Sequence, residues 1–129
     1  FKAIAESTSL PVIVYNVPGR TGINMTVETV LRCSEIPNIV GDKEANGDLA
    51  HSAAIMEAAP DFKIWSGNDN DNFHLWCMGA WGAISVTSHI VAGQQREMLG
   101  HILAGRLPEA AAIGDRRART AAARTRVAR

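Results

Sequence analysis

Lys43 is the residue of this sequence best suited to covalent chemistry. It follows a short apolar run in "NIVGDKEANGD", residues 38–48, at a position where the interior of a sheet or barrel would surround it with apolar side chains. Burial disfavours the charged amine, lowers its pKa and makes a neutral nucleophile available for attack on a carbonyl. The Schiff base turns a ketone into an electron sink, and a phenol such as Tyr15 can move protons on and off the intermediate. The alternative interpretation has Lys43 pointing outward into solvent at a strand end, as most lysines do.

Four units of strand and helix are predicted to position these residues. A β-branched run closed by proline, "LPVIVYNVP" at 10–18, precedes an amphipathic stretch at 26–36 that opens on Thr26. The same order returns three times, at 38–45 and 48–60, at 62–69 and 71–80, and at 82–87 and 91–105. Strands that alternate with helices predict a parallel sheet covered by helices.

The predicted fold class is therefore α/β, and a (β/α) barrel is favoured over a doubly wound sheet. No GxGxxG or GxxxxGK motif follows any of the strands, so a nucleotide-binding interpretation has no motif behind it. In a (β/α) barrel the chemistry lies at the carboxyl ends of the strands. Those ends hold Tyr15, Lys43, Gly67 and the residues after Ile84.

Composition describes an ordinary chain of about one domain, with 129 residues, 47% hydrophobic and 20% charged residues, and a formal net charge of zero. The opening "FKAIAEST" does not resemble a signal peptide, and no apolar run approaches the roughly 18 residues of a membrane span. We therefore expect a cytoplasmic protein with no membrane partner. Cys33 and Cys77 fit that compartment as reduced residues.

Charge is distributed unevenly along the chain. Residues 1–105 hold six Lys/Arg against eleven Asp/Glu, whereas residues 106–129 hold seven Arg against two acids. We divide the chain into a body, 1–112, and a basic Arg/Ala-rich tail, 113–129, which is either a solvated helix or a disordered end. We expect no nucleic-acid partner, because residues 106–129 contain no aromatic side chain and no recognised binding motif.

Four stretches carry a resemblance to a known family. They are "VYNVPGRTG" (14–22), "GDKEANGD" (41–48), "WSGNDN" (65–70) and "GAISVTSHIV" (82–91), and in this order they resemble dihydrodipicolinate synthases, within the N-acetylneuraminate lyase superfamily of class I aldolases. The resemblance implies a TIM (β/α)8 barrel of which residues 1–112 supply strands five to eight, the C-terminal half. It implies a lyase that condenses pyruvate with aspartate semialdehyde in diaminopimelate and lysine biosynthesis. It also implies a homo-oligomer without cofactor, since the covalent Schiff base on Lys43 does the chemistry.

The resemblance also assigns roles to individual residues. Lys43 resembles the Schiff-base lysine and Tyr15 the tyrosine that transfers protons during imine formation and condensation. Arg20 resembles the arginine that binds the aldehyde's carboxylate, for which a planar guanidinium is suited. Ile84 resembles the isoleucine whose carbonyl lies against pyruvate, and Gly67 the glycine that permits close approach of the main chain.

The sequence departs from the family pattern at several points. In the family, the threonines that bind the carboxylate of pyruvate, and a tyrosine from a neighbouring subunit, belong to the part of the barrel before the fifth strand. Half a barrel also exposes strand edges, which favour self-association. Asp42 stands where the family has an apolar residue. Alternation along the strand sends the Asp42 side chain outward, beneath the helices. Burial there without a partner raises the pKa of its carboxyl, unless the half barrel leaves the side chain exposed to water. Asn68 replaces an aspartate and keeps its hydrogen-bonding capacity, and the tail differs from the family's last helical segment.

No metal site is expected. "GNDNDN" at 67–72 lacks the glycine and the terminal glutamate of a calcium loop, and His74 and Cys77 are two ligands without a third. Two function classes remain. One is an enzyme of the dihydrodipicolinate synthase type, or a related pyruvate-dependent sugar-acid aldolase. The other is a catalytically inactive half barrel that acts as a self-associating structural module.

Overall fold

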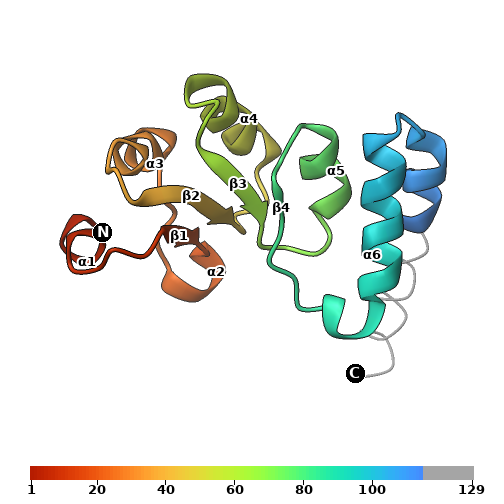
Figure 1. The fold of residues 1–129 in the computed structure, drawn as a ribbon, viewed down its shortest axis with the longest axis horizontal. Coiled ribbons are helices and arrows are strands. Elements are labelled where there is room, and N and C mark those ends of the chain that lie inside the picture. Colours follow the sequence, from red (N-terminus) through yellow and green to blue (C-terminus); the bar gives the residue numbers. More distant parts are fainter. Residues whose placement is uncertain (115–129) are drawn as a thin grey trace. The chain divides into compact units, whose positions relative to one another are not determined.

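The computed structural model describes residues 1–114, so the predicted basic tail lies outside the described residues from residue 115 onward. The chain divides into two compact units, the first spanning 1–84 and the second beginning at Ser85. The first unit contains the following elements in chain order (Figure 1): α1 (Lys2–Glu6), β1 (Val12–Asn16), α2 (Pro18–Thr21), α3 (Val27–Ser34), β2 (Ile39–Glu44), α4 (Leu49–Ala58), β3 (Lys63–Ser66), α5 (Asn72–Cys77) and β4 (Gly82–Ala83).

The four strands form one parallel sheet in the order β1-β2-β3-β4, so β1 and β4 lie at its edges. Helical segments separate consecutive strands, which confirms the predicted α/β pattern. Because the strands are parallel, all four carboxyl ends meet at one edge of the sheet. The residues expected to do chemistry therefore share that edge.

Side chains of the strands alternate between a covered face and an open face, as the pleat requires. Val14 and Ile64 point to the covered face, where α3 and α4 pack against the sheet (Figure 1). Ile13 and Tyr15, which alternate with Val14, are 38% and 42% exposed. The core thus lies between the sheet and its helices, and its buried members are Ala5, Val14, Met25, Val30, Cys33, Ile39, Ile55, Phe62 and Ile64.

Side-chain caps fix where two of the helices begin. Thr26 accepts a hydrogen bond from the backbone N–H of Thr29 at 3.2 Å, so the predicted threonine cap of α3 is confirmed. Asp48 caps α4 by accepting from the amides of Ala50 and His51 at 2.9 and 3.1 Å.

The strand predicted at 82–87 is shorter than expected and ends at Ala83. Beyond it, the Ser85 hydroxyl accepts a hydrogen bond from the amide of Ser88, the first residue of α6, at 3.0 Å. The second unit continues with α6 (Ser88–Leu103), which is kinked at Val91, and with helical residues 107–114.

Candidate active site

Tyr15 and Lys43 lie side by side on the open face of the sheet. β1 and β2 pair in a register that sets Tyr15 opposite Lys43, and each is the next-to-last residue of its strand. The Lys43 Nζ lies 4.0 Å from the centre of the Tyr15 ring, which is a cation–π arrangement. The structure therefore brings together the amine and the phenol that the sequence singled out.

Gly67 allows the chain after β3 to approach Lys43 closely. Its amide donates to the Glu44 carbonyl at 2.7 Å, and a Cβ at this position would lie only 3.1 Å from Lys43 Cγ and 3.0 Å from that carbonyl oxygen. The same Cβ would lie 2.9 Å from the Ala45 Cβ, so a side chain here would have to displace Ala45 as well as the stem of the lysine and the backbone of β2. Asn68, which follows, donates to Asp71 at 3.1 Å, so its amide does form a hydrogen bond.

Ile84 and Arg20 lie at the same edge as Lys43 but make different contacts. The Ile84 amide donates to the Ser66 carbonyl at 2.9 Å, which extends the pairing of β4 with β3 by one hydrogen bond. Arg20 is exposed on α2, the short helix that follows β1 and ends at Gly22, whose φ is +71°. Among the described residues no hydrogen bond, ion pair or cation–π pair joins Arg20 to Tyr15 or Lys43.

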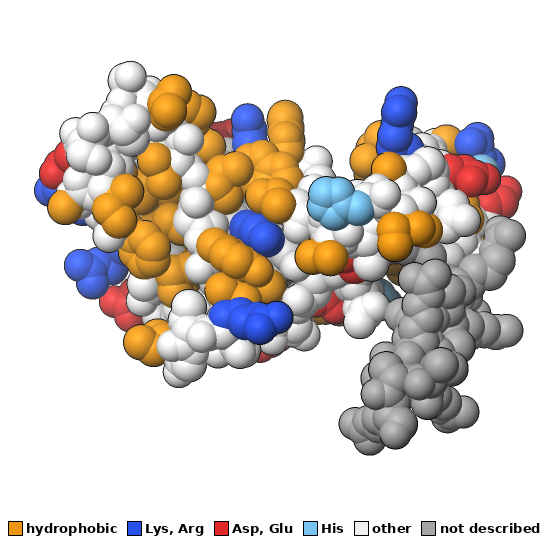
Figure 2. All heavy atoms as spheres, turned by 90° about the horizontal axis from the view of Figure 1, so that it is seen from below, with side chains coloured by type: hydrophobic (Ala, Val, Ile, Leu, Met, Phe, Trp, Pro, Cys, Tyr) orange, Lys and Arg blue, Asp and Glu red, His pale blue; other side chains and the backbone are white. Residues whose placement is uncertain are grey.

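The expected enclosure of Lys43 by apolar side chains is not provided by residues 1–84. Lys43 is only half-buried, and the neighbouring Trp65 is half-exposed. Lys63, also on this face, holds its Nζ 4.2 Å from the ring of Trp81, which is 63% exposed. On the left of Figure 2, hydrophobic side chains of the first unit gather around basic ones on one face of the molecule. Lys43 is therefore desolvated only if a further layer of protein covers this face of the sheet.

Asp42 points to the covered face and is fully buried, with no exposed surface. Neither of its carboxyl oxygens has a hydrogen-bond partner among the described residues. Burial, followed by repulsion from the neighbouring Glu44, raises the pKa of Asp42 to about 8. The expected burial of Asp42 is confirmed, and the alternative that an open barrel leaves Asp42 wet is wrong, because the helices cover that face of β2.

A buried polar cluster that sequence reasoning missed lies directly behind the candidate pair. Asn16 and Glu44, each adjacent in sequence to Tyr15 or Lys43, are 1% and 2% exposed. The Asn16 amide donates to both Glu44 carboxyl oxygens at 3.1 and 3.0 Å, and His51 Nε2 lies 3.2 Å from Glu44 Oε2. The available signal was alternation, since polar residues next to Tyr15 and Lys43 must face the helices.

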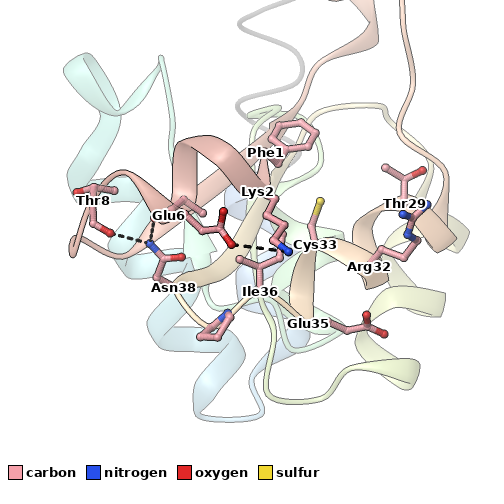
Figure 3. Close-up of a pocket in the computed structure, with 12 residues that line it drawn as sticks. Phe1, Lys2, Glu6, Thr8, Thr29, Arg32, Cys33, Glu35, Ile36 and Asn38 are labelled. Carbon is pink, nitrogen blue, oxygen red and sulfur yellow. Dashed lines mark hydrogen bonds and ion pairs between the residues drawn. The ribbon is translucent and has the colours of Figure 1, made fainter.

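A cavity lies at the opposite end of the sheet from Lys43. It has a volume of about 830 Å³ and lies between α1, α3 and the chain entering β2 (Figure 3). Asn38 bridges its wall by donating to the carbonyls of Ala5 and Thr8, while Lys2 and Glu6 form an exposed ion pair at 3.7 Å. Because it faces the amino ends of the strands, this cavity is separate from the candidate site.

Within residues 1–114 no three His, Cys, Asp or Glu side chains are arranged to hold a metal ion. Within the same range, no helix is both long and apolar enough to cross a membrane.

Comparison with known proteins places these features in a family. The model of the Dihydrodipicolinate synthetase family matches residues 1–124. A 4-hydroxy-tetrahydrodipicolinate synthase of Dehalococcoides mccartyi is 54% identical over 114 residues, which cover 88% of this chain and 38% of the relative.

Solved structures agree in fold. The dihydrodipicolinate synthase of Bacillus anthracis superposes with a TM-score of 0.86 at 44% identity, over 89% of this chain and 40% of that one. A dihydrodipicolinate synthase of Acinetobacter baumannii complexed with pyruvate gives a TM-score of 0.82 at 40% identity, over 88% of this chain and 40% of that one. The chain thus spans about two fifths of the length of the relatives it matches.

Proposed function

Because the chain belongs to the dihydrodipicolinate synthetase family, we propose that it supplies the nucleophile and the proton-transfer residue of a Schiff-base lyase. The reaction proposed is the condensation of pyruvate with aspartate semialdehyde, in diaminopimelate and lysine biosynthesis. The observation that carries the proposal is the pairing of Lys43 with Tyr15 across β1 and β2, with 4.0 Å between the amine and the ring centre. That a relative has been solved with pyruvate bound supports the first substrate.

In the proposed mechanism the neutral amine of Lys43 adds to the ketone carbon of pyruvate. Tyr15 transfers the protons needed for loss of the carbinolamine hydroxyl as water, which leaves the imine. Loss of a methyl proton gives the enamine, whose carbon attacks the aldehyde of the second substrate. Cyclisation through the second substrate's own amine then releases Lys43. The imine itself is the electron sink, so these steps call for no metal and no organic cofactor.

The remaining site residues act on substrate position. Arg20, exposed beyond the end of β1, pairs with the carboxylate of the aldehyde substrate through its planar fork. Gly67 keeps the space beside the Lys43 stem free, and the backbone at Ile84 lines the pyruvate side of the pocket. Each lies at the carboxyl edge of the sheet, which is where (β/α) barrels carry their active sites.

We also propose that β1 to β4 are strands five to eight of a (β/α)8 barrel. The order of the motifs around Tyr15, Lys43, Gly67 and Ile84 supports this numbering, as does the presence of four parallel strands where the fold has eight. A barrel interior is packed on all sides, whereas Ile13 and Tyr15 are 38% and 42% exposed here. The remaining strands, from a longer chain or from another copy in a homo-oligomer, would then cover Lys43 and supply the desolvation that its amine needs.

Borohydride trapping tests the proposal directly. The chain is incubated with pyruvate, reduced, digested and mapped by mass spectrometry. We expect one reduced adduct, on Lys43, which disappears in Lys43→Ala and persists in Lys63→Ala. Lys63 is the matched control because it lies on the same sheet face, opposite Gly41. Absence of any adduct, or equal labelling of Lys63 and Lys2, would contradict the proposed function for this chain.

A further inference from the structure

The buried side chain of Asn16 forms further hydrogen bonds besides those to Glu44. Besides reaching both Glu44 oxygens, its Nδ2 donates to Asn24 Oδ1 at 2.8 Å, and its Oδ1 accepts from the Met25 amide at 3.1 Å. Both amide protons and the amide oxygen are therefore used. Asn24 and Met25 belong to the segment 17–25 that follows β1 and carries Arg20, so Asn16 fastens the far end of that segment back to its own strand.

The chain after β2 is held by the same group of side chains. Glu44 Oε1 accepts from the Asn46 backbone amide at 2.7 Å, and the Asn46 side chain donates to Asn24 Oδ1 at 3.4 Å. Asn46 Oδ1 in turn accepts from the amide of Asp48, the residue that caps α4. The segments that follow Tyr15 and Lys43 are thus joined to each other as well as to their strands. We call Asn16, Asn24, Glu44 and Asn46 the asparagine network.

We infer that the asparagine network positions Arg20 relative to Lys43, with Asn16 and Asn24 as positioning residues that touch neither substrate. Tyr15 and Lys43 are register partners on the open face, and Asn16 and Glu44 are register partners immediately behind them. The network connects that second pair to the segment of Arg20, so the carboxylate-binding group and the Schiff-base lysine have one common support. This inference rests on the proposed function.

The geometry predicts an effect on one substrate only. Lys43 is fixed by β2 itself, whose neighbours β1 and β3 pair along its length. Arg20 lies on a four-residue helix, exposed to solvent. Such a segment depends more on the few bonds at its ends, because it has little buried apolar surface of its own. Loosening the network should therefore weaken recognition of the aldehyde's carboxylate and leave pyruvate capture at Lys43 intact.

Asn24→Ala is the main test variant, because Asn24 is exposed and its loss removes an acceptor shared by Asn16 and Asn46. Asn70→Ala, an exposed asparagine after β3, is the matched control. Asn16→Asp is the second variant. It keeps the shape and the acceptor for Met25 while turning the donor that faces Glu44 into an acceptor.

The first readout is hydrogen exchange by mass spectrometry over peptides that cover 17–25. We expect exchange at least tenfold faster in Asn24→Ala and in Asn16→Asp, and unchanged exchange in Asn70→Ala. The second readout compares how Asn24→Ala affects pyruvate and the aldehyde substrates. Pyruvate trapping at Lys43 should stay within twofold, the KM for aspartate semialdehyde should rise at least fivefold, and the KM for an aldehyde without a carboxylate should not change.

Unchanged exchange over 17–25 in Asn24→Ala, or an equal loss for pyruvate and for both aldehydes, would overturn the inference. Failure of the proposed function has a different signature, which is absence of a Lys43 adduct in the unsubstituted chain. In that case the exchange measurement alone decides whether the network holds the Arg20 segment.

Discussion

Replacement of Asp42 by asparagine should change how the stability of this chain depends on pH. Asp42 is fully buried, and neither carboxyl oxygen has a hydrogen-bond partner among the described residues. The pKa of Asp42 rises from 3.8 to about 8, because of burial first and Glu44 second. Asparagine has nearly the same shape and remains neutral at every pH of interest, so the exchange removes the titration with little change in packing.

The direction in which stability changes with pH follows from proton binding by Asp42. The folded state holds the Asp42 proton more tightly than the unfolded state, so unfolding releases a proton between the two pKa values. The stability that the protonated carboxyl provides is fully present below pH 3.8, declines as pH rises and is lost above about pH 8. At about 1.4 kcal/mol per pKa unit, a shift from 3.8 to about 8 amounts to at most about 6 kcal/mol. That is comparable to the whole stability of many small domains.

Urea unfolding followed by tryptophan fluorescence, at a fixed protein concentration and at each pH from 5 to 8, measures the effect. The free energy of unfolding of Asp42→Asn minus that of the unsubstituted chain should grow by about 4 kcal/mol across this range and level off above pH 8. Asp61→Asn, at an exposed aspartate, is the control and should give a flat difference. A difference for Asp42→Asn that stays constant within about 1 kcal/mol would refute the reasoning.

Two further substitutions test how the sheet and its helices are held. Gly41→Ala would place a Cβ 2.2 Å from the Lys63 carbonyl oxygen and 2.4 Å from the Trp65 ring, so we expect a loss of about 2 kcal/mol or more in urea unfolding. A loss below about 0.5 kcal/mol would show that β3 shifts freely. Asp48→Ala removes the cap of α4 and should cost about 1 kcal/mol by the same assay, whereas an unchanged midpoint would mean that Asp48 contributes nothing to helix stability.

Local patterns in the sequence predicted the alternation of four strands with helices, although they did not predict the short helix α2. The β-branched run at 10–18 and the cap at Thr26 are signals carried by a few adjacent residues, and they gave β1 and the start of α3. The shared edge of Tyr15 and Lys43 followed from parallel strands, which themselves followed from the alternation of strand and helix. The length of β4 did not follow, since the predicted strand 82–87 ends at Ala83 in the structure and the chain enters α6 at Ser88.

Other features depended on residues far apart in the chain. Alternation along β2, together with the expected barrel, places Asp42 and Glu44 on the face of the helices and Lys43 on the other. How completely the helices exclude water from Asp42 depends on packing by residues distant in sequence. The asparagine network joins Asn16 to Glu44 across two strands, and no short window of sequence contains both.

The sequence by itself predicted the α/β pattern and the family and singled out Lys43 and Tyr15 as candidates, because period, caps and motifs are properties of neighbouring residues. Only the tertiary structure decided that Asp42 is buried without a partner, that Lys43 lies on an open face, and that Asn16 connects two loops. Burial and hydrogen-bond partners arise from what packs against a strand. That depends on the sum of distant contacts rather than on the residues beside it.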